Sequence, residues 1–381
     1  MKACVVTNFP FYSGTGKVPF NIWHKLRDGG ICDADLFLTH YLSESEKSLG
    51  GNRGVKVLHP FTYDRSPILS RLMIYFADPF LLPKGYDVYH FGNHMIARFA
   101  QFRSPSVITV HDVLQFRYPE KFESSLSSKI YNYFMEASIK NLPRANRLIC
   151  VSNWSKGELL NIFGDIDPRK VSVVYNGLDH NIFYPRDRSR SRQKLGLPND
   201  RTIILHLGSE IERKQVPLLL RSFKELKKKY PDALLVRHGE KKEGTKKLID
   251  GLGLANDIVY YGYTQEEDLP YFYSAADVLV QPSSEEGFCF PVIEAMACGT
   301  PVAASNKASL PEVCGGAEAL QICELSEGSV VSALDKVLSL PLEERQAVVE
   351  RGIKNADRFS WEKTASQVYR VYQSIVEGDM K

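Results

Sequence analysis

Short hydrophobic segments alternate with stretches of helical periodicity along both halves of the chain. The short segments are rich in β-branched and other apolar residues, as buried strands are. Helix-like stretches separate them, so the pattern predicts parallel sheets covered by helices on both faces, an α/β fold. The predicted strands are residues 3–7, 55–58, 87–91, 107–111, 147–151 and 171–175 in the first half, and 202–207, 233–237, 258–261, 277–281 and 301–304 in the second.

Two helices and one irregular stretch suggest how the chain divides. Residues 216–229 carry apolar side chains at helical spacing, and a second amphipathic helix begins at Ser360. Residues 176–200 lie between the two groups of predicted strands. They show little periodicity and include the arginine-rich run 186–192, so we expect the domain boundary within them. A chain of 381 residues also exceeds the usual size of a single core. The predicted domains are residues 1–180 and 201–358, joined by a linker at 181–200.

The composition is that of an ordinary globular protein. Hydrophobic residues make up 44% and charged residues 24%, and the net charge of +3 is too small to favour nucleic acid as a partner. The seven cysteines are scattered without a C-x-x-C pair, so we interpret them as core thiols in a reducing cytosol. No apolar run is long enough for a signal peptide or a membrane span, and no metal-ligand cluster is found. We therefore expect a cytoplasmic protein without a bound metal.

Two glutamates bracket a turn rich in glycine, proline and aromatic residues within residues 283–302. Glu286 precedes the turn and Glu294 follows it, and apolar runs on both sides predict a strand, a loop, a helix and another strand. Pro291 suits the first helical position, and Gly299 suits the position just past the helix end. A helix start offers free backbone N–H groups, and carboxylates accept hydrogen bonds from hydroxyls. The segment therefore predicts a site for a phosphorylated ligand with many hydroxyl groups.

This segment resembles the donor-binding signature of glycosyltransferase family 4, whose members are retaining enzymes with the GT-B fold. The family's pattern of two glutamates separated by seven residues matches Glu286 and Glu294, and the surrounding Gly-Phe, Pro and Glu-Ala-Met-Ala context matches too. The resemblance implies two doubly wound Rossmann-like domains facing a cleft. It also implies that Glu286 and the turn hold the donor sugar, while Glu294 holds the ribose. The turn residues are Gly287, Phe288, Cys289 and Phe290. The simpler alternative is a pair of solvated acids.

A basic segment at the start of the helix 216–229 is the second candidate site. Arg213 and Lys214 stand where two cations and helix-start amides would neutralise a diphosphate. In the family an arginine usually follows the glycine of this segment, and here Ser209 takes its place. The resemblance also places the nucleotide base near Tyr263, after another predicted strand. Solvated basic residues and a plain turn are the respective alternatives.

The first half contributes weaker candidates. Residues 12–17 form a glycine-rich stretch after the first predicted strand, but the Gly and Ser/Thr positions that a P-loop requires hold other residues. The resemblance implies that this loop closes over donor phosphate and acceptor, with Gly14 and Gly16 allowing close approach. His111 ends a predicted strand and corresponds to a histidine that lies near the transferred sugar in the family. A purely structural histidine is the alternative.

Taken as a member of this family, the chain is expected to move a hexose from a nucleoside-diphosphate sugar to an acceptor hydroxyl with retention of configuration. GDP-mannose is the first expected donor and UDP-glucose the second. No metal or other cofactor is expected, because the resemblance implies that protein cations, here Arg213 and Lys214, neutralise the diphosphate in place of a divalent ion. The helix 360–381 is expected to cross back to the N-terminal, acceptor-side domain. The rival interpretations are a non-catalytic nucleotide-sugar-binding subunit and another GT-B sugar-nucleotide enzyme, such as an epimerase or a phosphorylase.

The acceptor is expected to be a carbohydrate or a lipid-linked carbohydrate bound by the first domain. Residues 66–83 are unusually apolar. They would suit a lipid carrier and a peripheral contact with the inner face of a membrane. The alternative for this stretch is a buried core helix.

Overall fold

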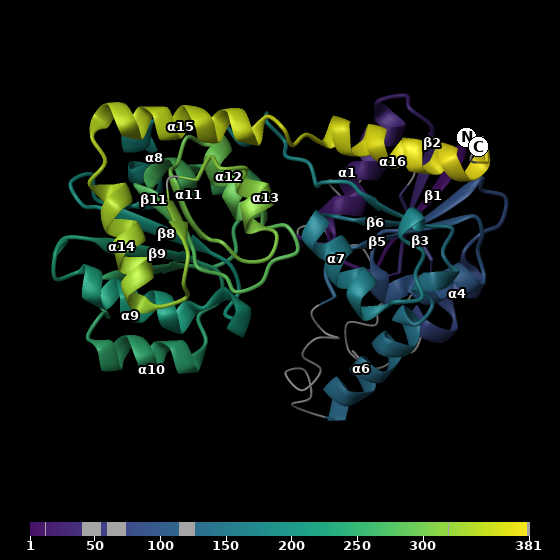
Figure 1. The fold of residues 1–381 in the computed structure, drawn as a ribbon, viewed down its shortest axis with the longest axis horizontal. Coiled ribbons are helices and arrows are strands. Elements are labelled where there is room, and N and C mark those ends of the chain that lie inside the picture. Colours follow the sequence, from purple (N-terminus) through teal and green to yellow (C-terminus); the bar gives the residue numbers. More distant parts are fainter. Residues whose placement is uncertain (12, 40–54, 59–73, 114–125, 319, 379–381) are drawn as a thin grey trace. The chain divides into compact units, whose positions relative to one another are not determined.

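The computed structural model describes residues 1–11, 13–39, 55–58, 74–113, 126–318 and 320–378 (Figure 1). The chain forms two compact units. The first consists of Met1–Gly177 with Trp361–Lys381, and the second consists of Leu178–Ser360.

The first unit is built on a parallel sheet with the strand order β3-β2-β1-β4-β5-β6-β7 in the described residues. Its inward positions are apolar and fully buried, for example along β1 and β5. The strands are β1 (Lys2–Thr7), β2 (Asp33–Leu38), β3 (Val55–Val57), β4 (Val88–Phe91), β5 (Ser106–Val110), β6 (Arg147–Cys150) and β7 (Val171–Val173). The helices include α1 (Lys17–Asp28), α4 (Asp78–Leu81), α6 (Leu126–Ile139), α7 (Asn153–Ile162) and α16 (Trp361–Val376).

The C-terminal helix α16 belongs to this first unit, where it packs against α1 (Figure 1). Its apolar face is buried, and polar contacts fix its position. The Tyr372 hydroxyl lies 2.7 Å from Nδ1 of the buried His90. Nε2 of the same ring lies 2.7 Å from the hydroxyl of Thr109 on β5. The helix is therefore tied to two neighbouring strands through one histidine.

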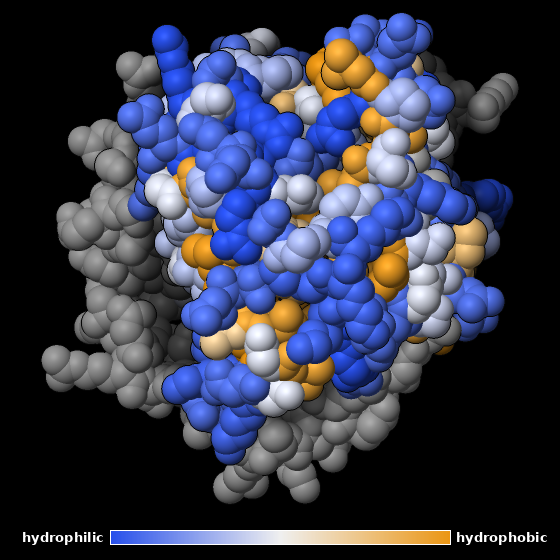
Figure 2. Space-filling model, turned by 90° about the vertical axis from the view of Figure 1, so that its left-hand side faces the viewer, coloured by the Kyte–Doolittle hydropathy of each residue, from blue (hydrophilic) through white to orange (hydrophobic). Residues whose placement is uncertain are grey.

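The second unit contains a parallel sheet with the order β10-β9-β8-β11-β12-β13. The strands are β8 (Ile203–Leu207), β9 (Leu234–His238), β10 (Ile258–Tyr261), β11 (Val278–Gln281), β12 (Val302–Ser305) and β13 (Leu320–Ile322). The helices are α8 (Arg188–Leu195), α9 (Val216–Leu226), α10 (Glu243–Leu252), α11 (Leu269–Ala275), α12 (Phe290–Ala297), α13 (Leu310–Cys314), α14 (Glu327–Leu338) and α15 (Leu342–Ala356). The face seen in Figure 2 is mostly hydrophilic, with hydrophobic residues in small separate groups.

The predicted α/β fold is confirmed in its strands. Each predicted strand is present within two residues of its expected ends, and the apolar stripe of α9 is buried. Two strands, β2 and β13, were not predicted. The expectation of core thiols holds for Cys4, Cys150, Cys289, Cys298 and Cys314, whereas Cys32 is half-buried and Cys323 is exposed.

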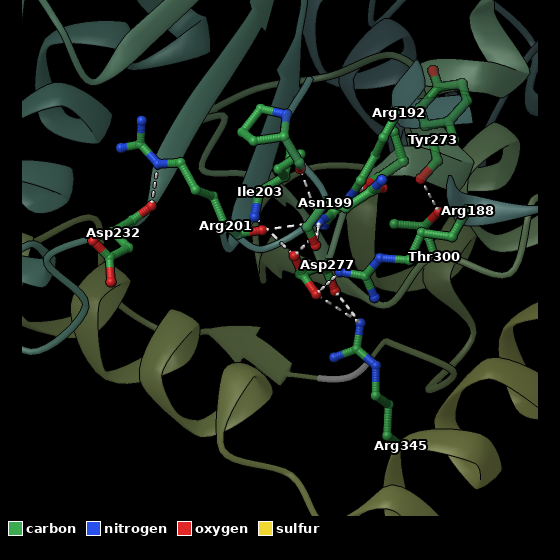
Figure 3. Close-up of polar contacts among 12 residues, drawn as sticks. Arg188, Arg192, Asn199, Arg201, Ile203, Asp232, Tyr273, Asp277, Thr300 and Arg345 are labelled. Carbon is green, nitrogen blue, oxygen red and sulfur yellow. Dashed lines mark hydrogen bonds and ion pairs between the residues drawn. The ribbon is translucent and has the colours of Figure 1, made fainter. Parts of the chain in front are cut away.

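The stretch expected to be a linker is instead part of the second unit. Residues 181–200 contain α8, and Arg192 on this helix is only 2% exposed. Its guanidinium pairs with Asp277 at 3.0 Å, and Figure 3 shows Arg188 and Arg345 meeting the same carboxylate. Its remaining donors reach the carbonyl oxygens of Ala275, Pro198, Asn199 and Arg201. A charged run that suggests a solvated linker here packs against the start of β11.

Among the described residues, no helix is both long and apolar enough to cross a bilayer.

Candidate active site

The candidate site of the second unit lies where two neighbouring strands end. β8 and β11 are paired in parallel, so the loops that follow them emerge at the same edge of the sheet. The backbone N–H of Ser284 donates to the carbonyl of Arg213 at 2.8 Å. In return, Nη1 of Arg213 donates to the carbonyl of Glu285 at 2.9 Å. The basic loop and the glutamate turn are thereby bound directly to each other.

Buried Lys214 and Glu286 form an ion cluster with the half-buried Arg213. The two carboxylate oxygens of Glu286 each accept from one cation, Arg213 Nη1 and Lys214 Nζ, both at 2.6 Å. Glu286 is 4% exposed and Lys214 is 8% exposed. Burial alone would raise the pKa of Glu286, but the charges of Lys214 and Arg213 outweigh it and lower this pKa to about 2. With two positive charges and one negative charge, the cluster keeps a net charge of about +1 and favours an anion.

Backbone conformation around the cluster is unusual at three positions. Gly208, just after β8, has φ +138°, and a Cβ there would lie 3.2 Å from Cε of Lys214. Gln215 and Cys289 adopt left-handed φ values of 53° and 77° although neither is glycine. Each stands at the start of a helix, α9 and α12 respectively. Such strained residues concentrate at functional sites, which supports a binding role for these two loops.

The helix after the glutamate turn is as predicted. Pro291 lies in the first turn of α12, and Gly299 follows its end with φ +74°. Glu294 is only 2% exposed and accepts a hydrogen bond from the Tyr273 hydroxyl at 2.6 Å. Neither Glu286 nor Glu294 is therefore a solvated acid, and that alternative is wrong.

The turn between the two glutamates is itself mostly buried. Gly287, Phe288 and Cys289 are buried, and the ring of Phe288 packs against those of Phe290 and Phe359, with centroids 5.4 and 5.5 Å away. Since these side chains pack against the protein, any contact from this turn to a ligand falls to its backbone N–H groups.

Two further predicted residues lie in other loops at this edge of the sheet. Ser209 directly follows Gly208 and is half-buried. Tyr263 follows β10 and is 75% exposed, with its ring edge-on to His238 at 6.3 Å between centroids. Because β8, β9 and β10 are parallel neighbours, the loops that carry these residues share one edge. An exposed ring there is accessible to a planar base.

In the first unit, the two glycines of the predicted loop differ in whether the structure requires glycine. A Cβ on Gly16 would lie 1.9 Å from the carbonyl oxygen of Pro10, so only glycine fits there. A Cβ on Gly14 would meet nothing within 4 Å. The close approach at Gly16 is thus to the chain's own backbone at the start of α1, and no steric need for glycine exists at position 14.

His111 follows β5 and is held in one tautomer. Its Nε2 lies 2.9 Å from the carbonyl oxygen of Gly92, which can only accept, so Nε2 carries the proton. Burial lowers the pKa of His111, an effect that the Gly92 carbonyl and Asp112 oppose only in part. A neutral imidazole with an unprotonated Nδ1 is the form expected near neutral pH.

Sequence reasoning overlooked a buried network beneath the basic loop. Arg237 on β9 is fully buried, contacts Nδ1 of His206 on β8, and lies 3.3 Å from the carbonyl of Gly208 and 3.7 Å from Glu210. Glu210 also accepts from the Thr245 hydroxyl at 2.6 Å. The one available signal was a charged residue inside the apolar run of β9. Through Gly208 and Glu210, this network holds the loop after β8 that carries Lys214.

The chain therefore consists of two Rossmann-like α/β units, and the second presents a cation–glutamate cluster and a second buried glutamate at one edge of its sheet. Residues 187–355 match the family model described as glycosyl transferases group 1, and residues 14–182 match the model described as glycosyltransferase family 4. The chain belongs to glycosyltransferase family 4 and is a glycosyltransferase.

Its relatives include O-antigen chain mannosyltransferase B from Escherichia coli, which is 31% identical over 279 residues, 71% of this chain and 70% of that protein. D-inositol 3-phosphate glycosyltransferase from Mycobacterium tuberculosis is 29% identical over 241 residues, 61% of this chain and 49% of that protein. The match therefore spans about half of the latter relative's length.

Solved structures confirm the GT-B fold. Sucrose-phosphate synthase from Thermosynechococcus elongatus superimposes with a TM-score of 0.79 at 20% identity, covering 99% of this chain and 100% of that chain. HepE from Anabaena, solved in complex with UDP and glucose, gives a TM-score of 0.77 at 20% identity, covering 98% and 100%.

Proposed function

We propose that this glycosyltransferase transfers a hexose from a nucleoside-diphosphate sugar to an acceptor hydroxyl with retention of configuration. GDP-mannose is the first proposed donor and UDP-glucose the second. The observation that carries the proposal is the ion cluster of Glu286 with Arg213 and Lys214. It combines net positive charge for a diphosphate with a carboxylate for sugar hydroxyls. The mannosyltransferase relative favours the first donor, and the HepE complexes with UDP-glucose favour the second.

Each residue of the cluster has a distinct proposed role. During transfer the bond between C1 of the sugar and the diphosphate oxygen breaks, and negative charge grows on the departing diphosphate. Arg213 and Lys214 stabilise that charge together with the backbone N–H groups at the start of α12. The acceptor oxygen forms the new bond to C1 on the same face, and its proton passes to the departing phosphate. Glu286 accepts hydrogen bonds from the sugar hydroxyls, and no side chain acts as a nucleophile.

Residues around the cluster complete the proposed donor site. Glu294 accepts from the ribose hydroxyls, and Tyr263 offers its exposed ring to the base. Ser209 replaces one cation that the family usually has, so Arg213 supplies the second positive charge. From the first unit, neutral His111 is proposed to contact the transferred sugar, with Gly14 and Gly16 in the loop that meets donor phosphate and acceptor.

Activity is expected to survive an excess of EDTA. Two side-chain cations already provide the charge that a divalent ion would supply to the diphosphate. The measurement compares turnover of GDP-mannose and UDP-glucose with and without EDTA. Complete loss of activity that manganese restores would contradict metal independence.

Replacing Glu294 with glutamine is expected to weaken binding of free GDP or UDP by roughly 10- to 150-fold. One charge-assisted hydrogen bond to the ribose contributes about 1.5–3 kcal/mol. Calorimetry with each nucleotide measures the effect. The matched control is Tyr273→Phe, which removes only the hydroxyl that donates to Glu294. Equal losses in both variants would mean that the Glu294 contact with Tyr273, rather than with ribose, sets affinity.

The donor itself is tested by thermal shift with a set of nucleotide sugars, followed by mass spectrometry of the products. GDP-mannose is expected to raise the melting temperature most and to yield a product heavier by one hexose. Donor binding without any transfer to the acceptors supplied would favour the rival interpretation of a nucleotide-sugar-binding subunit.

A further inference from the structure

A pocket in the first unit lies at the carboxyl end of β1, the edge where open α/β sheets bind ligands. It encloses about 450 Å³ of empty space, part of it open to solvent. Its lining is mainly apolar and aromatic, and it includes Tyr75, Met95, Phe99 and Phe134. Only a few polar groups reach it, as is usual for a ligand site.

Two of those polar groups, Asn8 and Arg98, are incompletely satisfied. The guanidinium of Arg98 lies over the Tyr75 ring at 4.1 Å and near the Phe102 ring at 5.5 Å. No carboxylate pairs with it within the described residues. Its Nε and the Oδ1 of Asn8 are buried without a hydrogen-bond partner there. A cation and an acceptor left unpaired at an apolar wall suit a ligand that brings an anionic group.

The surface beside the pocket is aromatic and exposed. Phe76 is 53% exposed and Tyr133 is 70% exposed, and both rings contact Phe134, which lines the pocket. On α4, Phe80 and Leu81 are 62% and 50% exposed. A buried core helix is therefore wrong for these positions of the apolar stretch 66–83, of which residues 66–73 lie outside the described part. Neighbouring exposed side chains of this size mark an interaction surface.

We propose that this pocket binds a lipid-linked acceptor, in which a phosphate joins the sugar to an apolar chain. Arg98 contacts the phosphate, and the side-chain Oδ1 of Asn8 accepts a hydrogen bond from a hydroxyl of the acceptor. The aromatic wall packs against the apolar chain of the lipid. The exposed rings at the rim meet the membrane from which the chain enters, and no membrane-spanning helix is needed for that contact. This inference rests on the proposed transferase function and names its acceptor class.

The experiment uses the full chain and three probes: farnesyl phosphate below its micellar concentration, farnesol, and inorganic phosphate. Calorimetry is expected to show binding of farnesyl phosphate, weaker binding of farnesol, and none of phosphate. Arg98→Met should weaken the binding of farnesyl phosphate by roughly 10- to 150-fold, which is the effect of losing one charged hydrogen bond. Arg144→Met, an exposed arginine of the same unit that does not line the pocket, is the matched control and should bind normally.

A second variant fills the pocket in case Arg98→Met fails to fold. Ile74 lines the pocket and is only half-buried, so Ile74→Trp should block the probe while circular dichroism shows a normal fold. Unchanged farnesyl phosphate binding in a folded Ile74→Trp or Arg98→Met variant overturns the proposal, as does tighter binding of inorganic phosphate than of farnesyl phosphate. GDP and UDP binding by the second unit is measured in parallel, so failure of the transferase proposal appears separately.

Discussion

The alanine variant of Lys214 is expected to turn over its donor sugar roughly 100- to 1000-fold more slowly than the native protein. The ammonium group is buried, and Nζ lies 2.6 Å from Glu286 at the proposed diphosphate site. Losing one strong, preorganised donor to a charge that grows in the transition state costs about 3–4 kcal/mol. Steady-state turnover of GDP-mannose and of UDP-glucose measures the loss.

Lys228→Ala is the matched control, because this lysine is exposed and its ion pair within the described residues is with Glu225, three positions earlier, at 2.6 Å. Its turnover should equal that of the native protein. Lys214→Ala is expected to fold, because Arg213 can still pair with Glu286 in that variant. Circular dichroism and thermal melting check that it does. Near-normal turnover of a folded Lys214→Ala variant would show that the lysine supports only the loop.

Strand β2 was not predicted because two acidic residues interrupt its apolar run. β2 begins with Asp33 and contains Asp35, so its run looks polar. In the structure Asp35 is only 8% exposed, and its partners come from other elements: Lys56 pairs with it at 2.8 Å, and the Tyr86 hydroxyl donates a hydrogen bond to it at 2.6 Å. A charge satisfied by residues far along the chain cannot be distinguished from a solvated one by local pattern alone.

The candidate site shows the same division between local and long-range information. The turn chemistry around α12 could be predicted, because Pro291 and Gly299 act through their own backbone conformation. The pairing of Glu286 with Arg213 could not, since 73 positions separate them along the chain and only the parallel pairing of β8 with β11 brings them together. The arginines near Asp277 were misinterpreted for the same reason.

Glu286→Gln is expected to reduce turnover of the donor sugar by roughly 10- to 150-fold without weakening the binding of free GDP or UDP. The amide keeps the shape of the side chain but loses the charge that strengthens hydrogen bonds from sugar hydroxyls. Free nucleotide lacks the sugar, and the change raises the local charge of the cluster from about +1 to about +2, which favours a diphosphate. Calorimetry with free nucleotide and turnover of the intact donor separate these two effects.

The pH dependence of stability gives Glu286→Gln a second readout that does not depend on any ligand. Because the folded-state pKa of Glu286 is about 2, below its ordinary value near 4.5, its ion pairs stabilise the fold fully above pH 4.5 and lose that contribution as the pH falls toward 2. The free energy of unfolding, measured by chemical denaturation, should therefore fall less steeply between pH 6 and pH 3 in Glu286→Gln than in the native protein. Equal slopes would mean that the carboxylate is not held by Arg213 and Lys214 in solution. If the slopes differ but Glu286→Gln and Glu294→Gln lose nucleotide affinity equally, the ion cluster is real and the assignment of Glu286 to the sugar is wrong.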